Sequence, residues 1–291
     1  MSRPNVFTRI ELLALRQSSG PAGPAVSRAF SLVELLVVIT IIVVLLALLT
    51  PAMDQAIQRA ELTVCAARHK GLVQIFHNYA TEFRRKFPSG KRNNDGYEHL
   101  PFVNYGLVDY VAKNAGNNKQ AATSGTVWGV VPEMLTDPSF ADSFGYRHDS
   151  LGYVVGYLYL AGRPAIGAAN NGTNGYPDWD SPIGLSALGS GEMTVCWNSW
   201  TLGISPVQGI AVGQWSVSAH AEGGGPLGSE PPNGGHFYHA GSGKDVRLLG
   251  AMGGNIGFAD GSAGWRRVEE MHERISASLN GEQNRNYPAL W

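Results

Sequence analysis

The first residues that could do chemistry are histidines and carboxylates in the C-terminal half of the chain. His220, His236 and His239 lie near several carboxylates in the sequence, and such a set can bind zinc or activate a nucleophile. The carboxylates concerned are Glu222, Glu230 and Asp245. The sequence has neither the H-E-x-x-H spacing of a zinc-binding helix nor the G-x-S-x-G turn of a serine hydrolase. We therefore expect loop histidines, no catalytic residues, and a protein that is not an enzyme.

Two cysteines, Cys65 and Cys196, are the other reactive candidates. A disulfide between them is one interpretation, provided that the body of the chain is exported to an oxidising compartment. Two separate thiols that pack as small hydrophobic side chains are the other. Cys65 falls on a predicted long helix, and nothing in the sequence fixes its distance from Cys196. Both interpretations therefore stay open.

Charge is distributed unevenly along the chain. The 291 residues hold 22 basic and 23 acidic side chains, which gives a formal net charge of −1. In the first 29 residues four arginines stand against one glutamate, which gives +3 there and leaves −4 for the remainder. A basic stub before an apolar run is typical of a cytoplasmic N-terminus. The near-zero total gives no electrostatic reason to expect a nucleic-acid partner.

An apolar run at residues 30–49 dominates the N-terminal part. It is 20 residues long and carries one charge, Glu34. A helix of this length spans about 30 Å, the thickness of a bilayer core. A secretory signal peptide would have a shorter apolar core of about 7–15 residues, followed by a small-x-small cleavage site. A plain membrane anchor also fits. A carboxylate at the membrane centre costs about 2.5–3.5 kcal/mol of insertion free energy, and one near the end of the span, like Glu34, costs less.

Residues 28–36, Arg-Ala-Phe-Ser-Leu-Val-Glu-Leu-Leu, resemble the prepilin cleavage and methylation motif of type IV pilins and type II secretion pseudopilins. The resemblance implies that a prepilin peptidase cuts between Ala29 and Phe30 and methylates the new amino group of Phe30. Ala29 stands where the family usually has glycine. The family's glutamate corresponds to Glu34, and its helix-kinking proline corresponds to Pro51, 21 residues after Phe30.

The same resemblance implies how Glu34 acts. Cleavage leaves a cationic amine on Phe30, and Glu34 of one subunit can neutralise Phe30 of its neighbour, which specifies the register of a filament. The alternative is a Glu34 side chain that simply extends to the lipid headgroups. The implied partners are the prepilin peptidase, homologous pilin or pseudopilin subunits, and an inner-membrane assembly platform with its cytoplasmic ATPase.

Beyond Pro51 the apolar positions narrow to one stripe. Spacings of three and four predict a helix with one buried face, formed by Cys65, Leu72, Phe76, Tyr79 and Phe83, with His69 filling a gap. The break at Pro88-Ser89-Gly90 predicts that the helix, begun at Phe30, ends at about Phe87. We expect His69 and His77 to be partly exposed on this helix, without a metal role.

The rest of the chain reads as a glycine-rich β region. Of 37 glycines, 26 lie between Gly152 and Gly264, interspersed with aromatic and β-branched residues. Predicted strands lie at 126–131, 153–160, 193–197, 210–217, 255–259 and 263–268. Asp260-Gly261 predicts a tight hairpin turn between the last two. The spacing of Val268, Met271, Ile275 and Leu279 predicts a short C-terminal helix.

His239 followed by Asp260-Gly261 resembles the C-terminal His…Asp-Gly signature of prepilin-associated proteins. The spacing of 21 residues is longer than is usual in that group. Some secretion pseudopilins hold calcium in a C-terminal loop, so the resemblance also makes Asp245 and Asp260 candidate oxygen ligands. Asp-Gly turns form without calcium, and we predict no obligatory cofactor.

The predicted fold is α+β, with a long N-terminal helix packed on a mostly antiparallel sheet and long glycine-rich loops. We expect a leader at 1–29, a transmembrane and polymerisation helix at 30–50, an amphipathic helix at 51–87 and a globular head at 88–291. The resemblance implies a subunit of a secretion pseudopilus or pilus-like filament, in the inner membrane with its head in the periplasm or outside the cell.

The alternative is an unprocessed, single-pass surface protein whose aromatic-rich head binds a carbohydrate or a protein. Exposed, coplanar rings would favour this alternative, whereas buried rings would favour a structural role. The tryptophans concerned are Trp128, Trp179, Trp197, Trp200, Trp215, Trp265 and Trp291.

Overall fold

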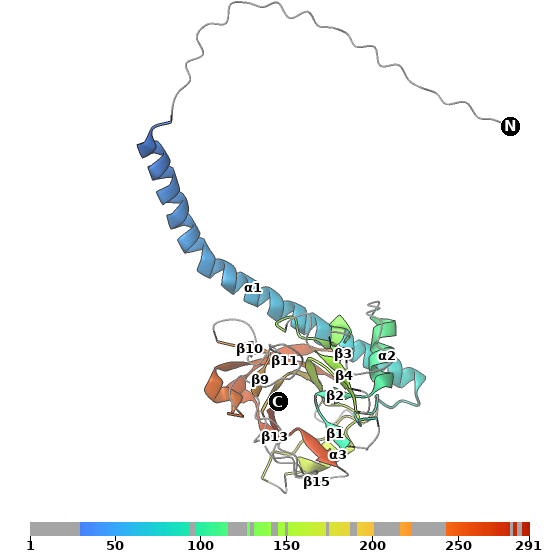
Figure 1. Ribbon diagram of the computed structural model, residues 1–291. Coiled ribbons are helices and arrows are strands. Elements are labelled where there is room, and N and C mark those ends of the chain that lie inside the picture. The colour runs from blue at the N-terminus through green and yellow to red at the C-terminus, as the bar shows by residue number, and fades with distance from the viewer. Residues whose placement is uncertain are drawn as a thin grey trace, which may run out of the picture. The chain divides into compact units, whose positions relative to one another are not determined.

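A long N-terminal helix leads into a region of small antiparallel sheets in the computed structural model (Figure 1). The structure describes residues 30–93, 97–115, 127–128, 131–140, 145–148, 151–172, 175–186, 191–200, 216–222, 243–279, 282–283 and 287–291. Its internal contacts divide the chain into two units, Met1–Thr50 and Pro51–Trp291. The predicted leader, 1–29, lies outside the described residues.

Helix α1 comprises Leu32–Glu82 and begins with a capping arrangement. Ser31 Oγ accepts a hydrogen bond from the Val33 backbone N–H at 3.3 Å, and Glu34 Oε2 accepts one from the Ser31 backbone N–H at 2.9 Å. A serine followed three residues later by a glutamate satisfies backbone donors that the first helical turn leaves free. Glu34 thus has a local structural role in the isolated chain.

The helix ends at Glu82, five residues before the predicted end. Arg84 and Arg85 have φ angles of 52° and 61°, so the chain turns through the left-handed region here. The Arg85 N–H closes the turn on the Ala80 carbonyl at 2.8 Å. A single bridge then pairs Lys86 with Gly184, which takes the chain away from the helix before Pro88 is reached.

Each of the sixteen described strands pairs with at least one other, and every described pairing is antiparallel. The five-stranded sheet has the order β10-β11-β7-β6, with β12 paired to β11. Its strands are β6 Tyr157–Tyr159, β7 Glu192–Cys196, β10 His220–Ala221, β11 Ala251–Phe258 and β12 Ala263–Arg267.

Three smaller sheets complete the described part of the head. The first is β1 Tyr97–His99, β14 Ala277–Leu279 and β15 Glu282–Gln283. The second is β13 Glu273–Ile275, β16 Pro288–Leu290, β8 Asn198–Trp200 and β9 Ser216–Ser218. The third is β2 Phe102–Val103, β5 Gly152–Val154, β4 Tyr146–His148 and β3 Val127–Trp128. The shorter helices are α2 Tyr105–Asn114 and α3 Pro164–Ala169, with 3-10 turns η1 Glu133–Leu135, η2 Val246–Leu249 and η3 Val268–Glu270.

The predicted hairpin at Asp260-Gly261 joins β11 to β12. Asp260 Oδ1 accepts the Ser262 N–H at 2.8 Å, and Gly261 has a φ of 87°, a conformation that glycine adopts without a Cβ clash. The hairpin register runs from Gly253 opposite Arg267 to Gly257 opposite Ala263.

The predicted C-terminal helix is wrong. Residues 268–279 form the turn η3 and the strands β13 and β14. Their partners are β16, at the end of the chain, and β1, about 180 residues earlier in the sequence. Local apolar spacing suggests a helix, but pairing with these distant strands satisfies the same backbone groups and decides the structure.

The second part of α1 lies against the five-stranded sheet. Its buried residues are Cys65, His69, Leu72, Val73, Ile75, Phe76 and Ala80. A Cβ on Gly257 of β11 would lie only 2.5 Å from Thr194 Oγ1, 3.1 Å from a Val73 methyl and 3.3 Å from His69 Cβ. Glycine at this position therefore lets helix and sheet approach closely. The predicted stripe is confirmed as far as Phe76, whereas Phe83 is exposed.

Candidate functional site

The first part of α1 is exposed along its whole length. Every residue from Phe30 to Pro51 is exposed, including an almost unbroken series of leucines, isoleucines and valines. By length and composition this is a helix that can cross a membrane, and it is the single such helix among the described residues. Large exposed apolar surfaces mark sites of contact with a membrane or another protein.

The residues predicted to direct processing and assembly lie at the two ends of this segment. Phe30 is exposed immediately before the helix, while Ala29 lies outside the described residues. Pro51 lies inside α1, and the preceding Thr50 donates its hydroxyl to the Leu46 carbonyl at 2.9 Å. This side-chain bond goes to the carbonyl four residues before Thr50 and does not replace the N–H that Pro51 lacks, whose helical acceptor would be the Ala47 carbonyl.

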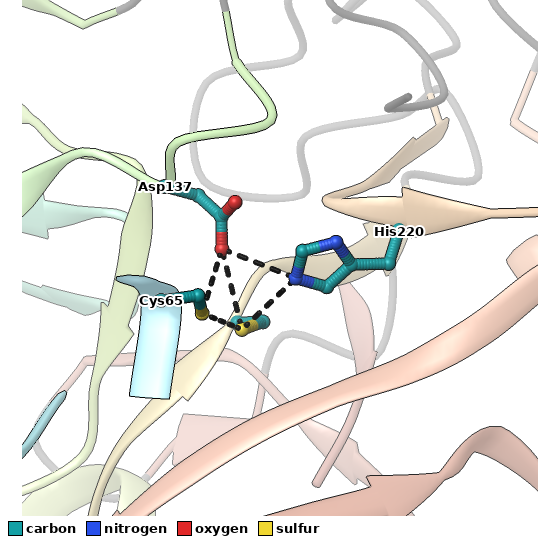
Figure 2. A group of neighbouring side chains, drawn as sticks. Cys65, Asp137 and His220 are labelled. Carbon is teal, nitrogen blue, oxygen red and sulfur yellow. Dashed lines mark hydrogen bonds and ion pairs between the residues drawn. The ribbon is translucent and has the colours of Figure 1, made fainter. Parts of the chain in front are cut away.

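A second candidate site is a buried cluster of four side chains, Cys65, Asp137, Cys196 and His220. Cys65 lies on α1, Asp137 follows η1, Cys196 ends β7 and His220 begins β10. Figure 2 shows Cys65, Asp137 and His220 pointing toward one another from three separate segments. Each of the four residues is at most 3% exposed.

One polar atom of each residue faces the centre of the cluster. The Cys65 and Cys196 sulfurs lie 3.1 Å apart, and both cysteines are free. Asp137 Oδ2 lies 3.1 Å from the Cys65 sulfur, 3.3 Å from the Cys196 sulfur and 3.4 Å from His220 Nε2. His220 Nε2 lies 3.7 Å from the Cys196 sulfur. All four atoms fall within 4.8 Å of one another.

Neighbouring groups orient the cluster. The Ser139 backbone N–H donates to Asp137 Oδ1 at 2.9 Å, and the Ser139 hydroxyl lies 3.0 Å from His220 Nδ1. Each of these bonds uses the outward atom of its residue, which leaves Asp137 Oδ2 and His220 Nε2 directed at the sulfurs. The Asn255 N–H donates to the Cys196 sulfur at 3.2 Å. Bonds of this kind fix ligand orientation in metal centres.

The cluster shifts the pKa values of His220 and of the two cysteines. Burial lowers the pKa of His220, but hydrogen bonds to Asp137 and Cys65 and their charges outweigh burial and raise it to about 9. Burial raises the pKa of the Cys65 thiol, but the Cys196 hydrogen bond and the nearby histidines bring it well below the usual value. Burial and the negative charges around Cys196 raise the pKa of its thiol. Cys65 is therefore the more acidic of the two thiols.

The prediction that His69 is partly exposed is wrong. His69 is fully buried on α1, where Nδ1 lies 2.6 Å from Thr194 Oγ1 and Nε2 lies 3.4 Å from the Cys196 sulfur. Its ring also lies 4.4 Å from that of Tyr157. His77 is half-buried, as expected, and its Nε2 lies 2.7 Å from the Ala259 carbonyl oxygen.

The other predicted site residues do not form a common site within the described part of the chain. His236 and His239 lie outside those residues, so the His…Asp-Gly pairing is not described. Asp245 caps η2 and forms an ion pair with Arg247, and Asp260 belongs to the hairpin turn. Calcium binding by these two aspartates remains a prediction.

The tryptophans bear on the alternative of a binding head. Side chains are described for five of them, and the buried four are Trp179, Trp197, Trp200 and Trp291. Trp265 is 37% exposed and lies 5.4 Å from the His220 ring. The described part of the head therefore presents no row of exposed coplanar rings, and most of these side chains serve the core.

The sequence alone singled out three members of the buried cluster but did not combine them. Cys65 and Cys196 were paired only as a disulfide alternative, and His220 was grouped with carboxylates near it in the sequence. Asp137 was missed, because nothing in its neighbours suggests a ligand. The Asp-Pro-Ser sequence at 137–139 does predict a turn in which the aspartate accepts a backbone N–H two residues later, as it does here.

No family model matches this chain, and neither the curated proteins nor the solved structures compared with it include a match.

Proposed function

We propose that this chain is a pilin-like structural subunit, cleaved before Phe30 and assembled into a pseudopilus or pilus-like filament through the first part of α1. The observation that carries the proposal is the exposed apolar helix with a glutamate in its first turn. The resemblance of residues 28–36 to the prepilin motif supports the same role. Sibling subunits would cover the apolar side chains after extraction from the membrane.

Glu34 is the residue on which the proposal can be tested most sharply. In the isolated chain it caps α1 through the Ser31 N–H. In a filament it would neutralise the new amino group of a neighbouring Phe30. The two roles need different chemistry, since a cap needs a hydrogen-bond acceptor and the neutralisation needs a negative charge.

Glu34→Gln and Glu34→Ala form a matched pair for this purpose. Glutamine retains an acceptor for the Ser31 N–H but carries no charge, whereas alanine removes both. If Glu34 acts by charge, both variants lose assembly, measured by sedimentation and electron microscopy of sheared filaments. If Glu34 acts only as a cap, Glu34→Gln assembles like the wild type.

Processing is tested independently by intact mass and N-terminal sequencing in a host that carries a prepilin peptidase. A mature chain that begins with methylated Phe30 supports the proposal, and Ala29→Gly should be cleaved at least as completely. A wild-type chain that retains its leader beside a fully cleaved control prepilin would sink the proposal. It would leave a single-pass anchored protein whose head must be studied for binding.

A further inference from the structure

We propose that Cys65, Asp137, Cys196 and His220 form a structural zinc site that fastens α1 to the five-stranded sheet. Four ligand-type side chains from four segments converge on one buried point, with their polar atoms all within 4.8 Å of one another. The site lies outside the exposed apolar part of α1, residues 30–51, and does not depend on the filament role. It is measurable on the unprocessed chain.

The donor set fits zinc better than other common metals. Two sulfurs, one imidazole nitrogen and one carboxylate oxygen are the ligand types that zinc takes, usually four at a time in a tetrahedron. Calcium and magnesium prefer six or more oxygens, and thiolates disfavour them. Because protein side chains supply all four donors, the site has no open position for substrate, which is the pattern of a structural centre.

Distances within the cluster are close to those between the corners of a zinc tetrahedron. Zinc–sulfur bonds of about 2.3 Å and zinc–nitrogen or zinc–oxygen bonds of about 2.0–2.2 Å place neighbouring ligand atoms roughly 3.3–3.8 Å apart. Five of the six separations run from 3.1 Å between the sulfurs to 3.7 Å between Cys196 and His220, and all six fall within 4.8 Å. Zinc binding requires the two sulfurs to move apart by about 0.7 Å.

The surrounding hydrogen bonds hold the ligand side chains in orientations that suit a central ion. Ser139 holds Asp137 Oδ1 through its backbone N–H and His220 Nδ1 through its hydroxyl, so one residue orients two ligands. The Asn255 N–H and His69 Nε2 approach the Cys196 sulfur from outside, at 3.2 Å and 3.4 Å. An N–H donor in such a position, as Asn255 supplies, offsets part of the negative charge that two thiolates and a carboxylate bring to one zinc ion.

A disulfide between the same cysteines is the competing occupant, and the geometry disfavours it. The sulfurs are 3.1 Å apart, whereas a disulfide bond measures about 2.03–2.05 Å. Both sulfurs also contact Asp137 Oδ2 as hydrogen-bond donors. Oxidation would remove both S–H donors and leave a fully buried carboxylate with His220 as its remaining partner at the cluster centre. Zinc instead replaces the two thiol protons, which pass to solvent, and it bonds the carboxylate directly.

The position of the site explains what the ion would do. Cys65 and Cys196 are 131 residues apart, and Cys65 and Asp137 are 72 apart, so one ion would close long loops between α1 and the head. Long closures restrict the unfolded chain more than short ones. The ion would thereby set how the second part of α1 rests on β7 and β11.

Metal content of the full chain, purified in detergent under reducing conditions without chelator, is the first measurement. Inductively coupled plasma mass spectrometry should find about one zinc per chain in the wild type. Cys196→Ser and His220→Ala should each lower zinc occupancy at least about tenfold. The matched controls are His77→Gln, on the same helix but outside the cluster, and Asp260→Asn, in the hairpin turn; both should retain the wild-type occupancy.

A second set of measurements separates loss of zinc from failure to fold. His220→Cys substitutes one zinc ligand for another, so it should still bind metal. Cobalt loading should then give it the visible absorption of tetrahedral Co²⁺ with a stronger thiolate-to-metal charge-transfer band than the wild type. Chelation of wild-type zinc should lower the melting temperature by on the order of 10 °C, because the ion binds the folded state alone.

Three results would overturn the assignment. One is a wild-type chain that binds no zinc when zinc is supplied to the reduced protein. Another is equal zinc occupancy in the wild type, Cys196→Ser and His220→Ala. The third is a purified native chain whose mass is lower by two hydrogens and whose Cys65 and Cys196 peptides are joined, which would establish the disulfide instead.

Discussion

The two parts of α1 share one helical backbone but place their side chains in opposite settings. Before Pro51 the residues are apolar and exposed, and the one carboxylate, Glu34, caps the first turn. After Pro51 the helix buries seven residues, of which Cys65 belongs to the polar cluster inside the head and His69 contacts that cluster. Exposed apolar side chains mark a surface that a membrane or another protein covers. Buried polar side chains instead take their hydrogen-bond partners from the same chain.

The largest expected contrast is between Phe76→Ala and Ile42→Ala. Phe76 is buried against Tyr159, with ring centres 4.9 Å apart, whereas Ile42 is exposed. Phe76→Ala should lower the free energy of unfolding by about 3–5 kcal/mol because it leaves a cavity. Ile42→Ala should change it by less than about 0.5 kcal/mol. Urea denaturation of the full chain in detergent, followed by tryptophan fluorescence, measures both. Equal losses of unfolding free energy in the two variants would contradict the proposed difference between the two parts of α1.

A smaller effect is expected where helix and sheet approach most closely. Gly257→Ala would place a Cβ 2.5 Å from Thr194 Oγ1 on β7 and 3.1 Å from a Val73 methyl on α1, so these neighbours must shift. The expected loss is about 1–3 kcal/mol in the same unfolding measurement. Gly264→Ala, across the hairpin, is the matched control, because its nearest neighbour would be a Phe258 ring carbon at 3.9 Å. An unchanged free energy of unfolding in Gly257→Ala would show that Gly257 is packed less tightly against Thr194 and Val73 than described.

Buried His99 of β1 should give the head a pH-dependent stability. Burial and the charges of Arg92 and Arg163 hold the pKa of His99 well below 6.5, and its Nε2 has no hydrogen-bond partner among the described residues. Its ring packs against Phe102 and Tyr287. The unfolded chain therefore binds a proton below pH 6.5 that the folded chain rejects, and stability is lost as the pH falls.

His99→Phe tests this expectation. Below pH 6.5 the wild type should lose up to about 1.4 kcal/mol per pH unit relative to the variant, and above it the two curves should run parallel. Taking the difference between the two proteins cancels the contributions of other titrating groups. Parallel curves down to pH 5 would show that His99 is protonated in the folded head.

The smallest expected effect lies at the start of α1. Ser31→Ala removes the hydroxyl that accepts the Val33 N–H, so the first turn should fray. Amide hydrogen exchange of residues 32–36 should accelerate, while the melting temperature of the head stays within error of the wild type. A lowered melting temperature would contradict the separation between the two parts of the helix.

Local sequence patterns predicted the elements that depend on near neighbours. The apolar run, the buried stripe as far as Phe76 and the Asp260-Gly261 hairpin follow from the composition, spacing or turn chemistry of one continuous segment each. Predictions failed where a distant partner decided the outcome. Residues 268–279 became strands through β1 and β16, and His69 became buried through Thr194 and Cys196.

The sequence by itself determined that this protein has an apolar helix able to cross a membrane, because length and composition alone decide that property. It likewise determined the amphipathic continuation and the tight turn. Only the tertiary structure decided that Cys65, Asp137, Cys196 and His220 meet. The Cys65 and Cys196 positions are separated by 131 residues, and no local pattern encodes such a distance. The physical reason is that a buried polar cluster is specified by which segments the core brings together, not by the residues beside each member.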